Sequence, residues 1–154
     1  AIDETMKSAN NELDGSINNN SVSQPISTKP KNKEIEDKLK YSKKIEVYDF
    51  VAKYFETYSG ETPGVKFKIK NNGNRILNEV EIVVFFKDSN KNIIAEEDFF
   101  PINVESFSSD FNKPLKPKYI WQMPEGKFLP AESIPSEWEE GNVSYKIKNI
   151  EFKS

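Results

Sequence analysis

Histidine and cysteine are both absent from this chain of 154 residues. Without histidine, the chain lacks the usual general base near neutral pH and the commonest ligand of transition metals. Without cysteine, it has no disulfides and no thiolate metal sites. These absences exclude a Ser-His-Asp triad, a Cys-His dyad and an ordinary zinc site. We expect a protein that is not an enzyme and binds no metal or cofactor. A catalytic site here would need carboxylates or a lysine with strongly shifted pKa values in a deep pocket.

A long apolar run and a strong net charge are also missing. No stretch approaches the roughly 20 apolar residues of a membrane-spanning helix. The net charge of -3 argues against a dedicated nucleic-acid binder. Hydrophobic residues make up 36% of the chain, and they are concentrated after residue 44. The roughly 110 residues that follow are sufficient for one hydrophobic core.

The first 44 residues differ from the rest in composition. Residues 15–33 are rich in Asn, Ser, Pro and Lys, and they predict a flexible tether because they bury too little apolar surface to offset the entropy of ordering. Ile35 and Leu39, four apart among mixed charges, predict one or two helical turns. Such a tether is typical of exported or lipid-anchored proteins. We therefore expect localisation in the periplasm or cell envelope, with a membrane tether upstream of residue 1. A cytoplasmic protein is the alternative.

Apolar residues recur at every second position in two runs between Gly64 and Phe100. The alternating positions are Val65, Phe67 and Ile69, followed by Val80, Ile82, Val84 and Phe86. Successive side chains of a strand point to opposite faces, so each run has one apolar and one solvated face. An antiparallel sheet of this kind needs a cover, and a second sheet supplies it. The sequence therefore predicts an all-β, antiparallel β-sandwich over residues 45–154.

About seven strands are predicted. The first covers residues 45–58, but its apolar residues change phase near Asp49, which either a β-bulge or a strand buried on both faces would reconcile. The closing strand begins at Val143 and changes phase at residues 148–149, which predicts a second bulge. The first and closing strands are the expected sheet edges.

The connections between strands carry turn residues. A turn is predicted over residues 59–64, and residues at positive φ are predicted in the loop 71–74. The irregular residues 101–117 predict a long connection that crosses between the sheets. One helical turn is predicted at Ser136–Glu139, with Ser136 as its cap.

The order of these features resembles the FxLYD-type domain, an immunoglobulin-like β-sandwich of bacterial envelope proteins. The resemblance rests on Gly64–Gly73, which reads GVKFKIKNNG, and on Val80–Ile94, which reads VEIVVFFKDSNKNII. Leu115–Lys118 is similar to the turn before a later strand of such domains, and Tyr145–Phe152 is similar to the closing strand. The resemblance implies an immunoglobulin-like sandwich that serves as a binding or spacer module. It implies no catalytic residues.

Four aromatic residues near or within a proline-rich loop are the candidate binding residues. They are Tyr119, Trp121, Phe128 and Trp138. Aromatic side chains on loops offer rigid contact area to a peptide, glycan or protein partner. The competing interpretation places Trp121 in the core and lets the loop pack over an open end of the sandwich.

Three further clusters have simpler interpretations. Asp88, Ser89, Asn90 and Asn92 resemble the start of a calcium loop, but one carboxylate and no glycine favour a hairpin turn. Acidic residues at 96–98 and 137–140 resemble paired catalytic carboxylates, but solvated charge runs explain them better. Lysines between residues 29 and 44 offer a basic surface for anionic lipid or wall polymer, which the interspersed acidic residues dilute.

The sequence thus favours a non-catalytic interaction or accessory module tethered in the bacterial cell envelope. Its expected partner is a protein or peptide, bound through loops or a sheet edge, and no nucleic acid is expected. The alternative is a structural assembly or oligomerisation unit whose N-terminal segment orders on a partner. We expect a monomer or a weak oligomer.

Overall fold

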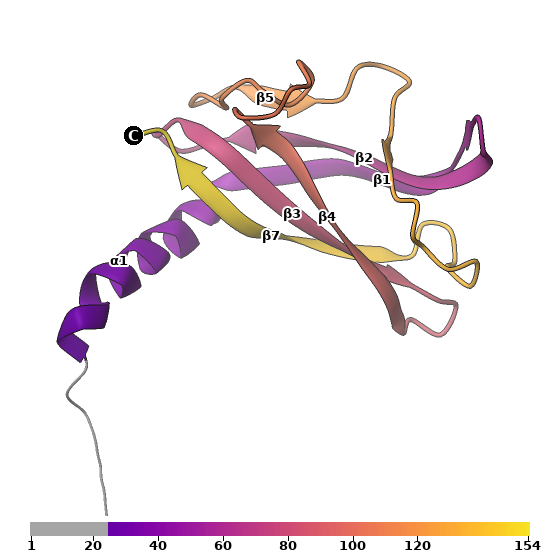
Figure 1. The fold of residues 1–154 in the computed structure, drawn as a ribbon, viewed down its shortest axis with the longest axis horizontal. Helices are drawn as coiled ribbons and strands as arrows, with labels where there is room; N and C mark the ends of the chain where they lie inside the picture. Colours follow the sequence, from indigo (N-terminus) through magenta and orange to yellow (C-terminus); the bar gives the residue numbers. More distant parts are fainter. Residues whose placement is uncertain (1–24) are drawn as a thin grey trace, which may run out of the picture. The chain divides into compact units, whose positions relative to one another are not determined.

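The computed structural model describes residues 25–154 as one helix followed by seven strands. The elements are α1 (Pro25–Ser42), β1 (Ile45–Thr57), β2 (Gly60–Asn71), β3 (Leu77–Lys87), β4 (Ile93–Asn103), β5 (Ile120–Gln122), β6 (Leu129–Pro130) and β7 (Val143–Phe152) (Figure 1). A compact unit extends from Lys38 to Ser154, so it includes the last turn of α1.

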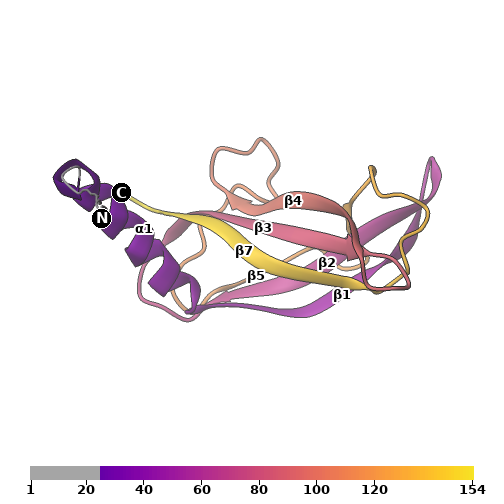
Figure 2. The ribbon, with the colours of Figure 1, turned by 90° about the horizontal axis from the view of Figure 1, so that it is seen from below.

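Two antiparallel sheets pack as a sandwich, as predicted (Figure 2). The first sheet has the order β1-β2-β5, and β6 also pairs with β2. The second has the order β4-β3-β7. The long connection after β4 crosses between the sheets, as expected. β1 and β7 are edge strands, as predicted; β4 and the short strands β5 and β6 form the other two edges.

The alternation of the sequence explains which side chains fill the interior. The seven alternating residues identified from the sequence lie on β2 and β3, and all seven are buried in the core, together with Leu77 at the start of β3. The lysines between them on β2, at positions 66, 68 and 70, face outward. This pattern gives the first sheet a basic row of side chains on its outer face.

Both predicted bulges are present. Between β1 and β2 the register changes from Tyr48 opposite Lys68 to Val51 opposite Lys66, and Asp49 has φ 53°. Aspartate tolerates this left-handed conformation better than most residues. Between β3 and β7, Glu81 pairs with Asn149 but the next residue, Ile82, pairs with Ile147. Lys148 is therefore the extra residue on β7. Each bulge returns the apolar residues of its strand to the core face.

The helix and three connections differ from prediction. α1 begins at Pro25, so residues 25–33 are helical rather than part of a flexible tether. Pro25 starts the helix, where proline is tolerated, and the Lys- and Glu-rich run of residues 33–40 has high helix propensity. Pro30, which lies between them, disfavours the helix. The remainder of the predicted tether, residues 1–24, lies outside the described residues. The turn after β1 is shorter than expected, because β2 already begins at Gly60.

The other two corrections concern the loop 71–74 and the segment 136–139. No residue of the loop 71–74 has a positive φ, so the predicted reason for Gly73 is wrong. A Cβ at Gly73 would collide with the ring of Tyr41, so this position requires a residue without a side chain. The predicted helical turn is absent from residues 136–139. The backbone makes a turn instead, closed by Trp138 N–H donating to Pro135 O at 3.1 Å.

Candidate functional site

Two of the four candidate aromatic residues belong to the core. Trp121 is 8% exposed and Trp138 is 3% exposed. The indole N–H of Trp121 donates to the carbonyl of Asp110 at 2.9 Å, and that of Trp138 donates to the carbonyl of Asn142 at 3.1 Å. Buried indoles usually need such a partner. Both side chains are therefore occupied by packing and hydrogen bonding within the domain.

The other two candidates lie at the surface, at separate places. Tyr119 is 59% exposed just before β5, with the Lys116 ammonium 5.7 Å from its ring centroid. Phe128 is half-buried and stacks on Phe55 of β1 at a centroid distance of 5.1 Å. The four residues predicted as one binding surface are thus divided between the interior and two exterior positions.

A loop excursion separates β5 from β6. Both strands run antiparallel to β2: Gln122 lies opposite Lys68, and Leu129 lies opposite Val65. Residues 123–128 leave the sheet between these two pairs. Lys66 and Phe67 therefore have no pairing residue on this side of β2 in the described ladders. The excursion turns back at Pro124, whose carbonyl accepts from Lys127 N–H at 3.0 Å, with Gly126 at φ 80°.

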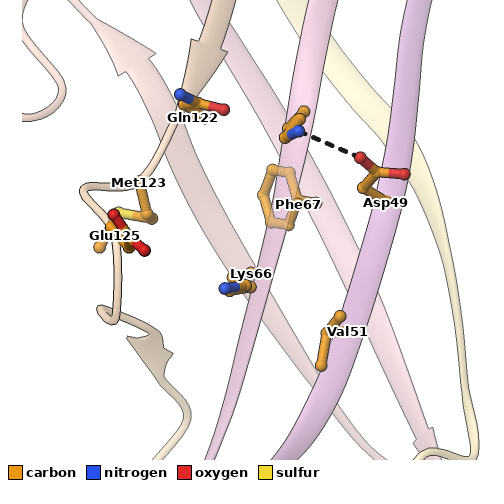
Figure 3. A pocket seen from close by; sticks show the side chains of 8 residues that line it. Asp49, Val51, Lys66, Phe67, Gln122, Met123 and Glu125 are labelled. Atoms are coloured by element: carbon orange, nitrogen blue, oxygen red, sulfur yellow. Dashed lines mark ion pairs between the residues drawn. The ribbon is translucent and has the colours of Figure 1, made fainter.

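A groove of about 420 Å³ lies where the excursion meets the sheet (Figure 3). It is lined by Asp49 and Val51 of β1, by Lys66, Phe67 and Lys68 of β2, and by Gln122, Met123 and Glu125. Figure 3 shows the β1 residues on one side of β2 and the residues at 122–125 on the other. The Asp49 carboxylate pairs with the Lys68 ammonium at 3.2 Å across the bulge.

Both walls of this groove come from irregularities in the sheet. The β1 bulge moves Asp49 out of the regular ladder, and the excursion after β5 removes the neighbour of Lys66. The sequence predicts the bulge from the change of apolar phase. It does not predict the excursion, although Pro124 and Gly126 mark a turn between two apolar stretches.

The lining of the groove mixes charged, polar and apolar groups. Its lining offers two ammonium groups, two carboxylates and one amide beside the apolar side chains of Val51 and Met123. These groups suit a ligand with mixed polarity, such as a peptide segment. Among residues 25–154, no group of three or more acidic side chains is arranged to hold a metal ion.

Three acidic residues of the other predicted clusters, Asp88, Asp98 and Glu140, make contacts within the domain. One carboxylate oxygen of Asp88 accepts from the backbone N–H groups of Asn90 and Asn92, both at 2.9 Å, which confirms the hairpin-turn interpretation. Asp98 accepts from the Lys148 ammonium at 3.0 Å. Glu140 accepts from Tyr54 N–H at 2.9 Å, and this contact occupies a backbone donor of the edge strand β1.

One glutamate on the outer face of the second sheet has a shifted pKa. Burial raises the pKa of Glu81, and the nearby Asp98 carboxylate raises it further. The Lys148 ammonium lies 3.8 Å from Glu81, and the hydrogen bond with Asp98 raises the pKa of this lysine. The three groups form a surface cluster of two acids and one base that lies away from the groove.

The helix α1 is too polar to cross a membrane, and it is the only helix among residues 25–154. Comparison with protein-family models, with curated proteins and with solved structures finds no match to this chain.

Proposed function

We propose that the protein is a non-catalytic interaction module that binds a protein or peptide partner in the groove between β2 and residues 122–125. The observation that carries the proposal is the gap in strand pairing at Lys66 and Phe67, where the sheet opens to a groove of mixed polarity. The bacterial cell envelope, which the FxLYD-type resemblance implies, is the proposed setting.

Contact geometry favours the groove over strand addition at β1. Strand addition requires a row of free backbone groups along an edge. β1 is interrupted by its bulge at Asp49, and its Tyr54 N–H already donates to Glu140. Such features protect edge strands from pairing with other chains. The alternative role in assembly depends on the N-terminal segment, of which residues 1–24 lie outside the described residues.

Peptide selection tests the proposal. A random peptide library displayed on phage is selected against the immobilised full chain, and the peptides are then measured by fluorescence anisotropy. We expect Lys66→Ala and Met123→Ala to weaken binding by about tenfold each, which corresponds to about 1.4 kcal/mol. Ile93→Ala is the matched control, because Ile93 is an exposed apolar residue outside the groove. Failure to select any peptide, or equal binding by the three variants, would contradict the proposal.

A further inference from the structure

A second groove lies at the end of the first sheet, where β1 begins and β2 ends. Its volume is about 570 Å³. Its lining consists of Lys44, Asn72, Gly73, Asn74, Pro117 and Lys118. The lining thus contains two ammonium groups and two side-chain amides, but no carboxylate. This composition differs from that of the groove in Figure 3, where lysines and carboxylates are equal in number.

Backbone hydrogen bonds tie the three segments of this second groove to one another. Asn72 N–H donates to the carbonyl of Lys44 at 2.8 Å, and Lys118 N–H donates to the carbonyl of Asn71 at 2.7 Å. Asn71 N–H in turn donates to the carbonyl of Tyr119 at 3.2 Å. The lining residues are therefore held in place before any ligand arrives, which lowers the entropic cost of binding.

Lys118 has a backbone conformation that glycine adopts more readily. Tyr119 N–H donates to the carbonyl of Lys116 at 3.0 Å, and this bond closes a turn with Pro117 second and Lys118 third. Lys118 has φ 72°, a conformation for which this kind of turn normally uses Gly or Asn. A lysine at this position accepts backbone strain and adds an ammonium group to the groove.

The surroundings of the groove are also basic. Lys70, at the end of β2, lies opposite Ile120, and Lys116 begins the turn that carries Lys118. The Glu46 carboxylate also lies at this end of the sheet: Glu46 is opposite Lys70, and its side chain accepts from the Asn72 amide at 3.3 Å. The two lysines of the lining thus have two further lysines and one glutamate beside them in the strands and the turn.

From this arrangement we infer that the groove between Lys44, Asn72–Asn74 and Lys118 binds a phosphate group of a ligand. A phosphate carries more than one negative charge and several acceptor oxygens, which match two ammonium groups, the Asn74 amide and the N–H of the Asn72 amide that does not donate to Glu46. Arginine binds carboxylate and phosphate alike through paired N–H groups, whereas lysine binds phosphate as a point charge. The single arginine of the chain, Arg75, instead stacks on Phe152 at 3.5 Å from the ring centroid. This site is independent of the peptide groove.

Titration of the full chain with sodium tripolyphosphate, followed by ¹H–¹⁵N NMR, tests the inference. We expect saturable shifts of the amide signals of residues 72–74 and 118. Lys118→Gly and Lys44→Gln should each weaken binding by about tenfold. Sodium citrate serves as the carboxylate probe and should bind more weakly than tripolyphosphate.

The chain offers a matched control for Lys118→Gly. Lys91 has φ 69°, close to that of Lys118, but it lies in the β3–β4 turn beside Asp88. Lys91→Gly therefore removes the same charge and relieves the same strain elsewhere, and it should leave binding unchanged. An equal loss of affinity for tripolyphosphate in the two glycine variants would show that only the net charge of the protein matters, and it would overturn the inference. Unchanged binding in both Lys118→Gly and Lys44→Gln, or tighter binding of citrate, would also overturn it.

Discussion

The hydroxyl of Tyr41 lies 2.8 Å from the side-chain oxygen of Asn71, and both side chains are buried. Tyr41 belongs to the last turn of α1, and Asn71 is the last residue of β2. The Asn71 amide donates to the carbonyls of Arg75 at 2.7 Å and Leu115 at 3.0 Å. The same hydroxyl accepts from Arg75 N–H at 2.9 Å. Each buried polar group in this network therefore has a partner, as buried polar groups generally require.

Removal of the Tyr41 hydroxyl should destabilise the domain. Tyr41→Phe leaves the ring in place but deprives Arg75 N–H of its acceptor and Asn71 of one donor. We expect the free energy of unfolding to fall by about 1–3 kcal/mol, because Arg75 N–H would lose its acceptor and the side-chain oxygen of Asn71 would keep only Gly73 N–H as a donor. Urea denaturation followed by tryptophan fluorescence measures the change. Tyr119→Phe is the control, and its exposed hydroxyl should contribute little; similar losses in both variants would contradict the role of the network.

Gly73 and Tyr41 should be energetically coupled. Gly73→Ala places a methyl group against the Tyr41 ring, and we expect a loss of about 1–3 kcal/mol, as for other overpacked sites. In a Tyr41→Ser background the methyl group has room, so the same change should cost less than about 0.5 kcal/mol. A double-mutant cycle by urea denaturation measures the difference. Additive losses would show that Gly73 is needed for another reason.

Glu151 should stabilise the fold at neutral pH and lose this effect in acid. A hydrogen bond from the Asn149 amide lowers the pKa of Glu151, and Lys38, 3.2 Å away, also lowers it. A folded-state pKa below the unfolded value gives stability that is present above the unfolded pKa and is lost as the pH falls through the folded pKa. We expect Glu151→Gln to lower Tm at neutral pH and to match the parent protein well below about pH 4. Calorimetry across this pH range measures the Tm of the parent protein and of the variant. A Tm difference that does not change with pH would contradict the stabilising role of the Glu151 carboxylate.

The contribution of Glu81 to stability should vary with pH in the opposite direction. Its pKa is raised by burial and by Asp98, so the folded state binds the proton more tightly than the unfolded state does. The associated stability is present in acid and is lost as the pH rises through the unfolded and then the folded pKa. We therefore expect Glu81→Gln to raise Tm at neutral pH, with the gain shrinking below about pH 4. The same calorimetric series tests this, and a lower Tm at neutral pH would show that the Lys148 contact outweighs burial.

The two core tryptophans should matter for stability rather than for partner binding. Trp138 packs against Phe86 and Tyr54, with ring centroids 5.3 and 5.1 Å away. We expect Trp138→Ala to cost about 3–5 kcal/mol, whereas Phe128→Ala, at a half-buried site, should cost less. Chemical denaturation followed by far-ultraviolet circular dichroism compares them. Equal costs would contradict the distinction between interior and exterior positions.

The alternation of apolar residues predicts the sandwich and its bulges because side-chain direction in a strand depends on local geometry alone. The change of phase at Asp49 allows a bulge or a strand buried on both faces, and the structure has the bulge, as it does near Lys148. The hydrogen bonds of Asp88 likewise follow from neighbouring residues. These features involve interactions over a few positions of the chain.

The sites depend on residues that are distant in sequence. Trp121 and Phe128 have the same aromatic character, yet one points into the core and the other outward because the strand leaves the sheet between them. Gly73 is required by Tyr41, which lies on another element. Lys44 and Lys118 meet beside the loop 71–74 only through the pairing of strands. The conformational preferences of short segments do not predict such contacts, because packing between separate segments brings these residues together.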